Sequence, residues 1–334
     1  MTGAAMDPAS FVRLRRLALA ALAIGYLHVV FGAIVRISGS GYGCGNHWPK
    51  CMGAWFPPLD RTDLVVELSH RYLAFALTLA IVGLALAAWA RHRDAGVGGA
   101  GGVLRPAGLS ALLVLVAAVF GAVIVKLDLQ NRYVVVVHLS LAMAILAALA
   151  VAAIRAGAFG RAMADAGGGS GRTLGGARAL VAITFVVLVM GALTANLPGA
   201  SFSCLGFPLC RNGYGGAFPY QHIQLTHRVL AFAVFFHALG LVVGVRRRDE
   251  SAQLARWAWA TFGTILAQVL LAAVMVELGL PLWARSAHEA IGTATWLVVV
   301  VFVSLAARAG GAGGAPVGAA MPVRPLAGAA GERA

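Results

Sequence analysis

Eight long apolar segments constrain the fold of this chain more than any other feature of its sequence. They cover Leu17–Val35, Tyr72–Ala90, Pro106–Val125, Tyr133–Ile154, Ala179–Leu197, Val229–Val245, Trp257–Val276 and Ala290–Ala307. A helix of about 20 apolar residues crosses the hydrocarbon core of a bilayer, and a helix satisfies its backbone hydrogen bonds within its own segment. The sequence therefore predicts an all-α membrane protein with eight transmembrane helices.

The composition supports a membrane protein and argues against a nucleic-acid-binding one. Hydrophobic residues make up 60% of the 334 residues and charged residues only 11%, whereas a soluble domain has about 25% charged residues. The net charge is +14, but the basic residues lie between the apolar segments and form no patch beside aromatic residues. Most of them lie in the two termini and in the loops after the second, fourth and sixth segments. Because basic residues concentrate on the cytoplasmic side of a membrane protein, both termini are predicted to be cytoplasmic.

The two halves of the chain repeat the same motifs in the same order. Glu67–Phe75 reads ELSHRYLAF, and Gln224–Phe232 reads QLTHRVLAF. Before them, FGAIVR at Phe31–Arg36 is echoed by MGALTA at Met190–Ala195. A parallel repeat of this kind predicts two pseudo-symmetric four-helix bundles, related by an axis along the membrane normal.

Stretches rich in glycine suggest where the bundles begin and end. We expect an amino-terminal bundle over residues 1–160 and a carboxyl-terminal bundle over residues 179–308. A Gly-rich stretch between them predicts a cytoplasmic linker at residues 161–178, and Gly96–Gly102 predicts another within the first half. The Gly-, Ala- and Pro-rich residues 309–334 predict a disordered cytoplasmic tail.

Four histidines occupy corresponding places, at the start of every second apolar segment: His70, His138, His227 and His288. They are expected at a similar depth near the outer face, two in each bundle. Any one of them is equally well explained by snorkelling or helix capping, because an ionisable residue at the edge of a segment costs little. Two facing imidazoles in a four-helix bundle can, however, ligate a haem iron. Zinc would need further ligands close by, and neither pair offers them.

The other histidines do not fit this pattern. His28 lies in the middle of the first segment and is expected to have no partner, and His237 lies at a different depth from His227. The last three are expected in loops: His47, His92 and His222. None of these five is expected to take part in either histidine pair.

Polar residues beside the histidines differ between the halves. Arg71 and Arg228 each follow a histidine, and they suit either lipid headgroups or porphyrin propionates, since a planar guanidinium matches a carboxylate. Glu67 lies one helical turn before His70, and Gln224 takes its place in the second half. A carboxylate beside a porphyrin can move protons or stabilise a developing cation, which predicts one reactive site and one holding site. The alternative is that Glu67 only favours the start of its helix through the macrodipole.

Cysteines occur as one pair in the first outer loop of each half. Cys44 and Cys51 lie in GYGCGNHWPKC, and Cys204 and Cys210 lie in SCLGFPLC. Disulfides persist outside the cytoplasm, and the spacing is unlike that of a four-cysteine zinc site. We therefore favour two local disulfides that pin the loops over the two sites; a redox role for the first pair stays open.

Together these residues resemble the haem A synthase family, in the bacterial form with a cysteine pair in each half. The likeness rests on GAIVRISGSGYGC, WPKC, ELSHR with its QLTHR echo, the later histidines and the paired cysteines, and it covers about Gly32–Thr295. It implies an oxidoreductase acting on a CH or CH2 group, which oxidises the C8 methyl group of haem O to the formyl group of haem A. Haem A is needed for the assembly of aa3-type terminal oxidases.

The resemblance also implies a role for each site. His70 and His138 would hold the substrate haem O, with Glu67 as the catalytic residue. His227 and His288 would ligate the iron of haem b, the cofactor. The resemblance further implies a multi-pass protein of the cell membrane, a haem O synthase that supplies the substrate, and an unidentified electron acceptor.

Two other classes of membrane protein also deserve weight. A di-haem transmembrane electron-transfer cytochrome b uses histidine pairs, but it usually places haems near both faces, whereas all four histidines here are predicted on one side. A transporter built on a repeat has its site near the midplane at broken helices, and these segments lack matching Pro-Gly breaks. Both are less favoured than the haem A synthase.

Overall fold

A computed structural model of the chain describes residues 8–127, 131–159, 168–214 and 218–311. Most of them form eight long helices: α1 (Pro8–Ser38), α2 (Thr62–Trp89), α3 (Leu104–Lys126), α4 (Arg132–Arg155), α6 (Gly171–Asn196), α7 (Gln221–Arg247), α8 (Ala252–Glu277) and α9 (Leu282–Gly311). All eight are long and apolar enough to cross a membrane. The predicted all-α protein with eight transmembrane helices is confirmed.

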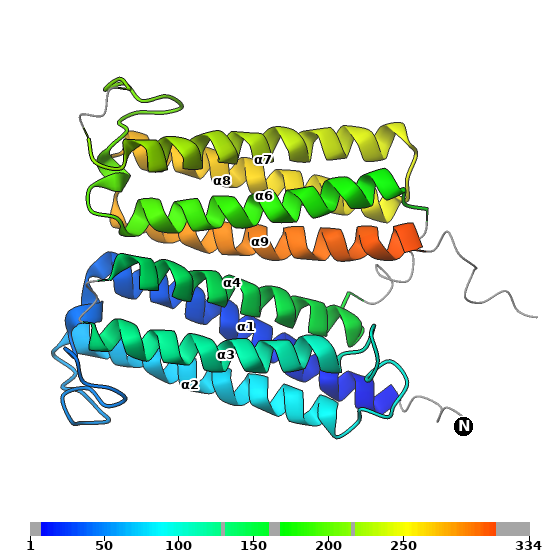
Figure 1. The fold of residues 1–334 in the computed structure, drawn as a ribbon, viewed down its shortest axis with the longest axis horizontal. Helices are drawn as coiled ribbons and strands as arrows, with labels where there is room; N and C mark the ends of the chain where they lie inside the picture. The colour runs from blue at the N-terminus through cyan, green and yellow to red at the C-terminus, as the bar shows by residue number, and fades with distance from the viewer. Residues whose placement is uncertain (1–7, 128–130, 160–167, 215–217, 312–334) are drawn as a thin grey trace, which may run out of the picture.

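The helices pack as two bundles that lie side by side (Figure 1). Helices α1 to α4 form one bundle and α6 to α9 form the other, and they meet along α1 and α4 on one side and α6 and α9 on the other. The segments that follow α1 and α6 lie at one end of the molecule (Figure 1). The start of α1 and the end of α9 lie at the opposite end, so equivalent parts of the two halves share one face.

The helices begin before the apolar segments do. Helix α2 begins at Thr62 and α7 at Gln221, whereas the uncharged segments begin only after the His-Arg pairs. His70 and His227 therefore lie about two turns inside their helices. The same holds for His138 and His288, so the histidines lie deeper within the helices than the edges of the apolar segments predict.

The predicted linkers are more ordered than their composition suggests. Helix α6 begins at Gly171, with Ser170 as its cap accepting from Thr173 N at 3.2 Å, so the second part of the predicted linker 161–178 is helical. Residues 160–167 and most of the predicted tail lie outside the described residues, while α9 continues to Gly311. In the loop after α2, Val97 is fully buried, and Arg155 donates to the Gly102 carbonyl at 2.9 Å.

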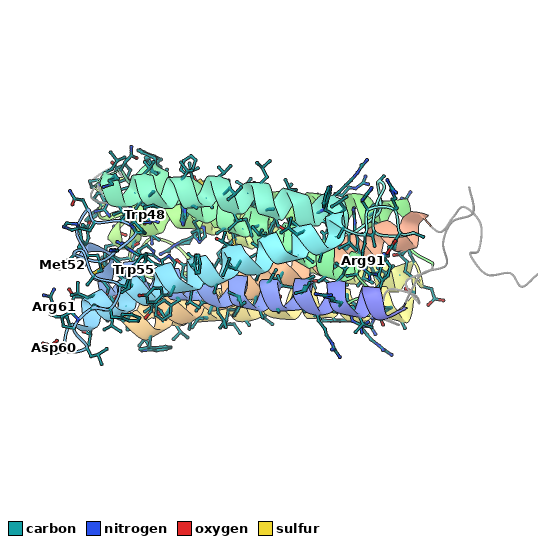
Figure 2. All side chains as sticks on the ribbon, turned by 90° about the horizontal axis from the view of Figure 1, so that it is seen from below. Trp48, Met52, Trp55, Asp60, Arg61 and Arg91 are labelled. Atoms are coloured by element: carbon teal, nitrogen blue, oxygen red, sulfur yellow. A yellow bond between two sulfur atoms is a disulfide. The ribbon has the colours of Figure 1, made fainter. Side chains whose placement is uncertain are left out.

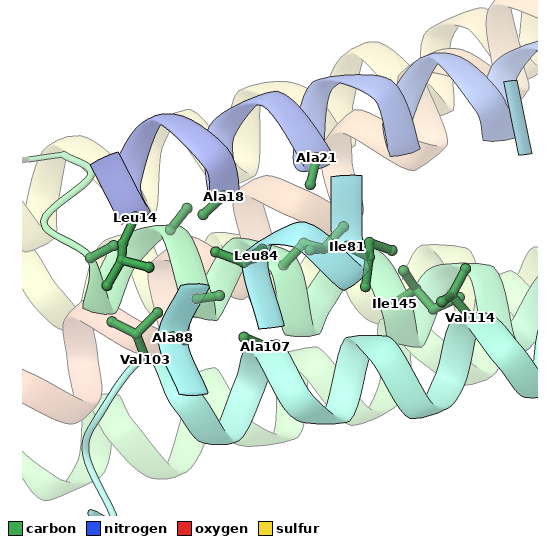
Figure 3. Close-up of a cluster of buried hydrophobic side chains, with 14 of the residues drawn as sticks. Leu14, Ala18, Ala21, Ile81, Leu84, Ala88, Val103, Ala107, Val114 and Ile145 are labelled. Atoms are coloured by element: carbon green, nitrogen blue, oxygen red, sulfur yellow. The ribbon is translucent and has the colours of Figure 1, made fainter. Parts of the chain in front are cut away.

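Small and branched apolar side chains alternate in the core of the first bundle. Figure 3 shows Leu14, Ala18 and Ala21 of α1 facing Ile81 and Leu84 of α2, all of them almost completely buried. Small residues let membrane helices approach closely. The core therefore fixes the spacing of the helices that carry the histidines nearer the outer end.

The two ends of the first bundle differ in side-chain character (Figure 2). Trp48, Met52 and Trp55 are exposed at the end that carries the loop between α1 and α2, and Arg91 lies at the opposite end. Tryptophan concentrates at membrane–water interfaces, and basic residues mark the cytoplasmic side. Arg61 also lies at the tryptophan end (Figure 2), so the orientation in the membrane stays a prediction.

Candidate functional site

The same disulfide-closed loop follows the first helix of each half. A short 3-10 helix at Ser40–Tyr42 or at Ala200–Phe202 leads into each loop. The predicted pairs are both present, as Cys44–Cys51 and Cys204–Cys210. The prediction of two local disulfides is confirmed.

Glu67 and Gln224 perform the same structural task in the two halves. Glu67 Oε2 accepts a hydrogen bond from Cys44 N at 2.8 Å, and Gln224 Oε1 accepts one from Cys204 N at 2.7 Å. Gln224 also donates to the Ser201 carbonyl at 3.1 Å. Both side chains are buried, so each fastens a disulfide loop to the helix that carries the His-Arg pair. This bond requires an oxygen acceptor but no charge.

The two arginines also hold these loops. Arg71 donates to the His47 carbonyl at 2.7 Å and forms an ion pair with Glu67. Arg228 donates to the carbonyls of Gly206 at 2.6 Å and Cys204 at 2.7 Å. A guanidinium has five donors, so one side chain can bind several loop carbonyls at once. The structure thus gives both arginines a structural role in addition to the predicted headgroup or propionate contact.

Only the first half combines a carboxylate with its arginine. The two oxygens of Glu67 bind different donors, since Oε1 meets Arg71 and Oε2 meets Cys44 N. In the second half the described partners of Arg228 are loop carbonyls. The sequence difference between Glu67 and Gln224 therefore appears as a buried ion pair that Arg228 does not repeat among the described residues.

The histidine pair of the first half includes a third imidazole. His70 stacks on His28 with the ring centroids 4.2 Å apart and the ring planes 5° from parallel. The expectation that His28 has no partner was wrong, because the apolar pattern of α1 does not show that the helix turns this ring toward α2. His138, on α4, packs against Gly121 of α3, where an added Cβ would lie 3.5 Å from His138 Cε1.

A cavity of about 220 Å³ lies beside the histidine pair of the second half. His227 and His288 line it, and most of its wall is apolar. His227 Nδ1 lies 3.1 Å from the Val187 carbonyl, which leaves Nε2 as the nitrogen available to a ligand. Gln268 Nε2 lies 3.3 Å from His288 Nε2 and 2.9 Å from the His288 carbonyl.

Glycines bring the first helix of each half close to its histidine. A Cβ added at Gly32 would lie 2.9 Å from His70 Cε1, and one added at Gly191 would lie 3.0 Å from His227 Cε1. Any larger residue would displace the imidazole. Gly32 of FGAIVR and Gly191 of MGALTA thus make room for the two imidazoles in the same way. The repeated sequence motifs therefore form equivalent histidine sites in the two halves.

The residues of the second half fit a haem held by two imidazoles. An iron-ligating histidine usually donates its second ring N–H to a carbonyl or carboxylate, which fixes the ring, and His227 makes such a contact with Val187 O. The His288 Nδ1 atom is buried without a hydrogen-bond partner among the described residues. In the same part of the chain, no group of three or more His, Cys, Asp or Glu residues could hold a metal ion by itself. The donors match a haem better than zinc.

The cavity of the second half is completed by side chains of the first. Arg36 of α1 lines it, as do Leu139, Ser140 and Met143 of α4. Arg36 Nη2 bonds Glu289 Oε1 at 2.5 Å, and Glu289 is the neighbour of His288. Sequence reasoning missed Arg36, although the change from arginine in FGAIVR to alanine in MGALTA was a visible signal.

Comparison with known proteins gives consistent matches over most of the chain. The COX15-CtaA family, described as cytochrome oxidase assembly protein, matches residues 15–300. A protein named Heme A synthase from Oceanobacillus iheyensis is 27% identical over 286 residues, which cover 83% of this chain and 90% of the relative. Another of that name, from Bacillus licheniformis, is 24% identical over 284 residues, or 84% and 91%.

A longer relative matches with similar identity. A protein named Protoheme IX farnesyltransferase from Thermus thermophilus is 29% identical over 327 residues, which cover 91% of this chain but only 50% of the relative. This chain therefore spans about half the length of the Thermus protein.

Proposed function

The chain belongs to the COX15-CtaA family of cytochrome oxidase assembly proteins, and we propose that it is a haem A synthase. Its reaction is the oxidation of the C8 methyl group of haem O to the formyl group of haem A, for assembly of aa3-type terminal oxidases. One observation carries the proposal: the two histidine sites share one construction, yet the residue that fastens the loop is a carboxylate in the first, Glu67, and an amide in the second, Gln224. The relatives named Heme A synthase align with most of this chain and support it.

The two bundles divide the work in this proposal. His70 and His138 hold the substrate haem O, and His227 and His288 hold haem b as the cofactor. A haem ligated by two imidazoles supplies one-electron redox chemistry. The cavity beside His227 and His288 supports the second assignment, because it is apolar and has imidazoles and arginines in its wall.

Glu67 is proposed as the catalytic residue of the first bundle. Gln224 fastens its loop without a charge, so fastening alone does not require a carboxylate at position 67. A carboxylate near the reacting methyl group can take up a proton or stabilise developing positive charge. Arg71, as the ion-pair partner, would keep this carboxylate in place.

The proposed setting is the cell membrane, with both termini in the cytoplasm. The basic residues at the end of the molecule opposite the disulfide loops support this orientation. We propose haem O synthase as the supplier of substrate. In support, the Thermus protein named Protoheme IX farnesyltransferase contains a region similar to this chain within a polypeptide about twice as long.

Analysis of extracted pigment tests the function. Membranes from cells that express this chain together with a haem O supplier should contain haem A. Replacing His227 or His288 by alanine should remove the tightly bound haem b. Replacing His70 or His138 should spare haem b but stop haem A formation. Membranes without haem A, or equal loss of haem b from all four variants, would contradict the proposal.

A further inference from the structure

The two halves differ one turn before the glycine that seats each histidine. In the first half this residue is His28, four positions before Gly32, and in the second half it is Val187, four positions before Gly191. Residues four apart share a face of a helix, so both positions face the histidine of the next helix. The repeat therefore contains a substitution directly beside each site.

In the second half, the backbone at this position supports the histidine. The Val187 carbonyl lies 3.1 Å from His227 Nδ1. A carbonyl partner of this kind fixes the ring of a ligating histidine and makes it a stronger ligand, and losing such a partner typically lowers metal affinity by about 10- to 100-fold. His227 is thus equipped for a group that stays bound.

In the first half, the stacked ring of His28 replaces the hydrogen bond that His227 makes with a backbone carbonyl. The His28 imidazole lies flat against His70, 4.2 Å away and nearly parallel. The Nδ1 atoms of both rings are buried, and neither has a hydrogen-bond partner among the described residues. The orientation of His70 is therefore set by stacking, and its basicity is not raised by a carbonyl.

We propose that His28 is a positioning residue that keeps His70 an exchangeable ligand for a haem. Its ring lies flat against the His70 imidazole and holds the plane of that ring, while His70 Nδ1 has no hydrogen-bond partner among the described residues. A haem bound at His70 is then held in a defined orientation but less tightly than one bound at His227. Because it assigns the substrate to His70, this inference rests on the proposed function. It also gives a physical reason for the inequality of the sites, since substrate must enter and product must leave.

Replacing His28 by valine, the residue at the equivalent position 187 of the second half, tests this role. His28→Val removes the ring and should allow His70 Nδ1 to bond the carbonyl of residue 28. Purified protein loaded with haem O should then release it to excess apomyoglobin about 10- to 100-fold more slowly than wild type. The low-spin electron paramagnetic resonance signal of this haem should also shift, because a hydrogen bond to Nδ1 makes the His70 imidazole a stronger ligand. His28→Phe keeps a stacked ring and should release haem O as wild type does.

The outcomes separate the alternatives. Unchanged or faster release from His28→Val, or slow release from His28→Phe as well, would overturn the role of the stacked ring. Retained haem b in the second bundle reports correct folding, and His28→Leu replaces His28→Val if that variant does not accumulate. Wild-type protein that binds haem O but makes no haem A would refute the proposed function without affecting the comparison of release rates.

Discussion

Glu67 and Gln224 accept the same backbone hydrogen bond, so charge and the ability to transfer a proton are what distinguish them. Glu67→Gln therefore tests chemistry while keeping the loop contact, because the amide oxygen can still accept from Cys44 N as Gln224 does from Cys204 N, although the ion pair with Arg71 is lost. The variant should insert, keep haem b and accumulate haem O. If general acid–base work is lost, the rate of haem A formation should fall by about 100-fold or more.

The matched control is Gln224→Glu, which places a carboxylate in the second bundle and should leave haem A formation in the first nearly unchanged. The measurement is the ratio of haem A to haem O in extracted pigment. A wild-type ratio in Glu67→Gln would show that the carboxylate only fastens the loop. The ion pair with Arg71 would then be a structural feature alone.

Some residues of the candidate site could be read from the sequence and others could not. Repetition identified His70 and His227, because each stands in a copied motif. His28 has no counterpart in the second half, and only the rotation of α1 brings it onto His70. Gln268 was missed for a similar reason, since its contact with His288 joins two helices whose relative rotation the apolar pattern does not determine.

At the scale of the elements, one buried carboxylate joins the start of α6 to the loop after α7. Glu250 Oε1 accepts from Ser170 Oγ and Thr173 Oγ1, both at 2.7 Å, and from Arg248 Nε at 2.6 Å. Burial alone would raise the pKa of Glu250, but the hydrogen bonds from Arg248, Ser170 and Thr173 outweigh it and hold the pKa below its ordinary value. The ionised carboxylate therefore stabilises the folded state.

The sign of this pKa shift predicts acid sensitivity. The stabilisation is complete above the unfolded carboxyl pKa of about 4.3 and is lost as the pH falls through the lower pKa of the folded state. Glu250→Gln should cost about 1–3 kcal/mol at neutral pH and flatten the loss of stability below about pH 4.3. Thermal unfolding in detergent across this pH range measures both effects. Asp94→Asn is the control, because Asp94 pairs with Arg91 on the surface at 3.5 Å and should change little.

The apolar pattern predicted the helices but not the residues at which α2, α6 and α7 begin. The uncharged segments end at charged residues, but α2 and α7 include their His-Arg pairs because Arg71 and Arg228 bind loop carbonyls. The Gly-rich residues predicted as a linker show the opposite case, because they continue into α6, which begins at Gly171. Glycine weakens a helix by only about 1 kcal/mol, and the cap at Ser170 starts the helix despite it.

At the scale of the whole molecule, the contacts between the bundles connect the two sites. Trp296 Nε1 donates to the Met143 carbonyl at 2.9 Å, and Tyr26 donates to the Ala290 carbonyl at 3.2 Å. These contacts could not be predicted from hydropathy, because an apolar helix face looks the same whether it meets lipid or another bundle. Tyr26 and Arg36 both belong to α1, the helix that also stacks on His70. Helix α1 thus touches the histidine site of each half.

Arg36 should therefore raise the reduction potential of the proposed haem b from across the interface, and its ion-pair partner Glu289 should lower it. Both side chains line the cavity, and Arg36 also donates to the Ala195 carbonyl at 3.4 Å. A nearby positive charge favours the reduced haem, so Arg36→Gln should lower the potential and Glu289→Gln should raise it. At an effective dielectric constant of about 20, one charge about 10 Å away contributes between 1 and 2 kcal/mol, or several tens of millivolts for one electron.

Redox titration of the haem b absorbance measures these shifts. The double variant Arg36→Gln, Glu289→Gln removes both charges and should return close to the wild-type potential, and Arg71→Gln is the control because Arg71 pairs with Glu67 in the other half. Shifts of the same sign in both single variants would mean that they disturb packing rather than the local field. With opposite shifts that cancel in the double variant, the first half would be shown to tune the cofactor of the second.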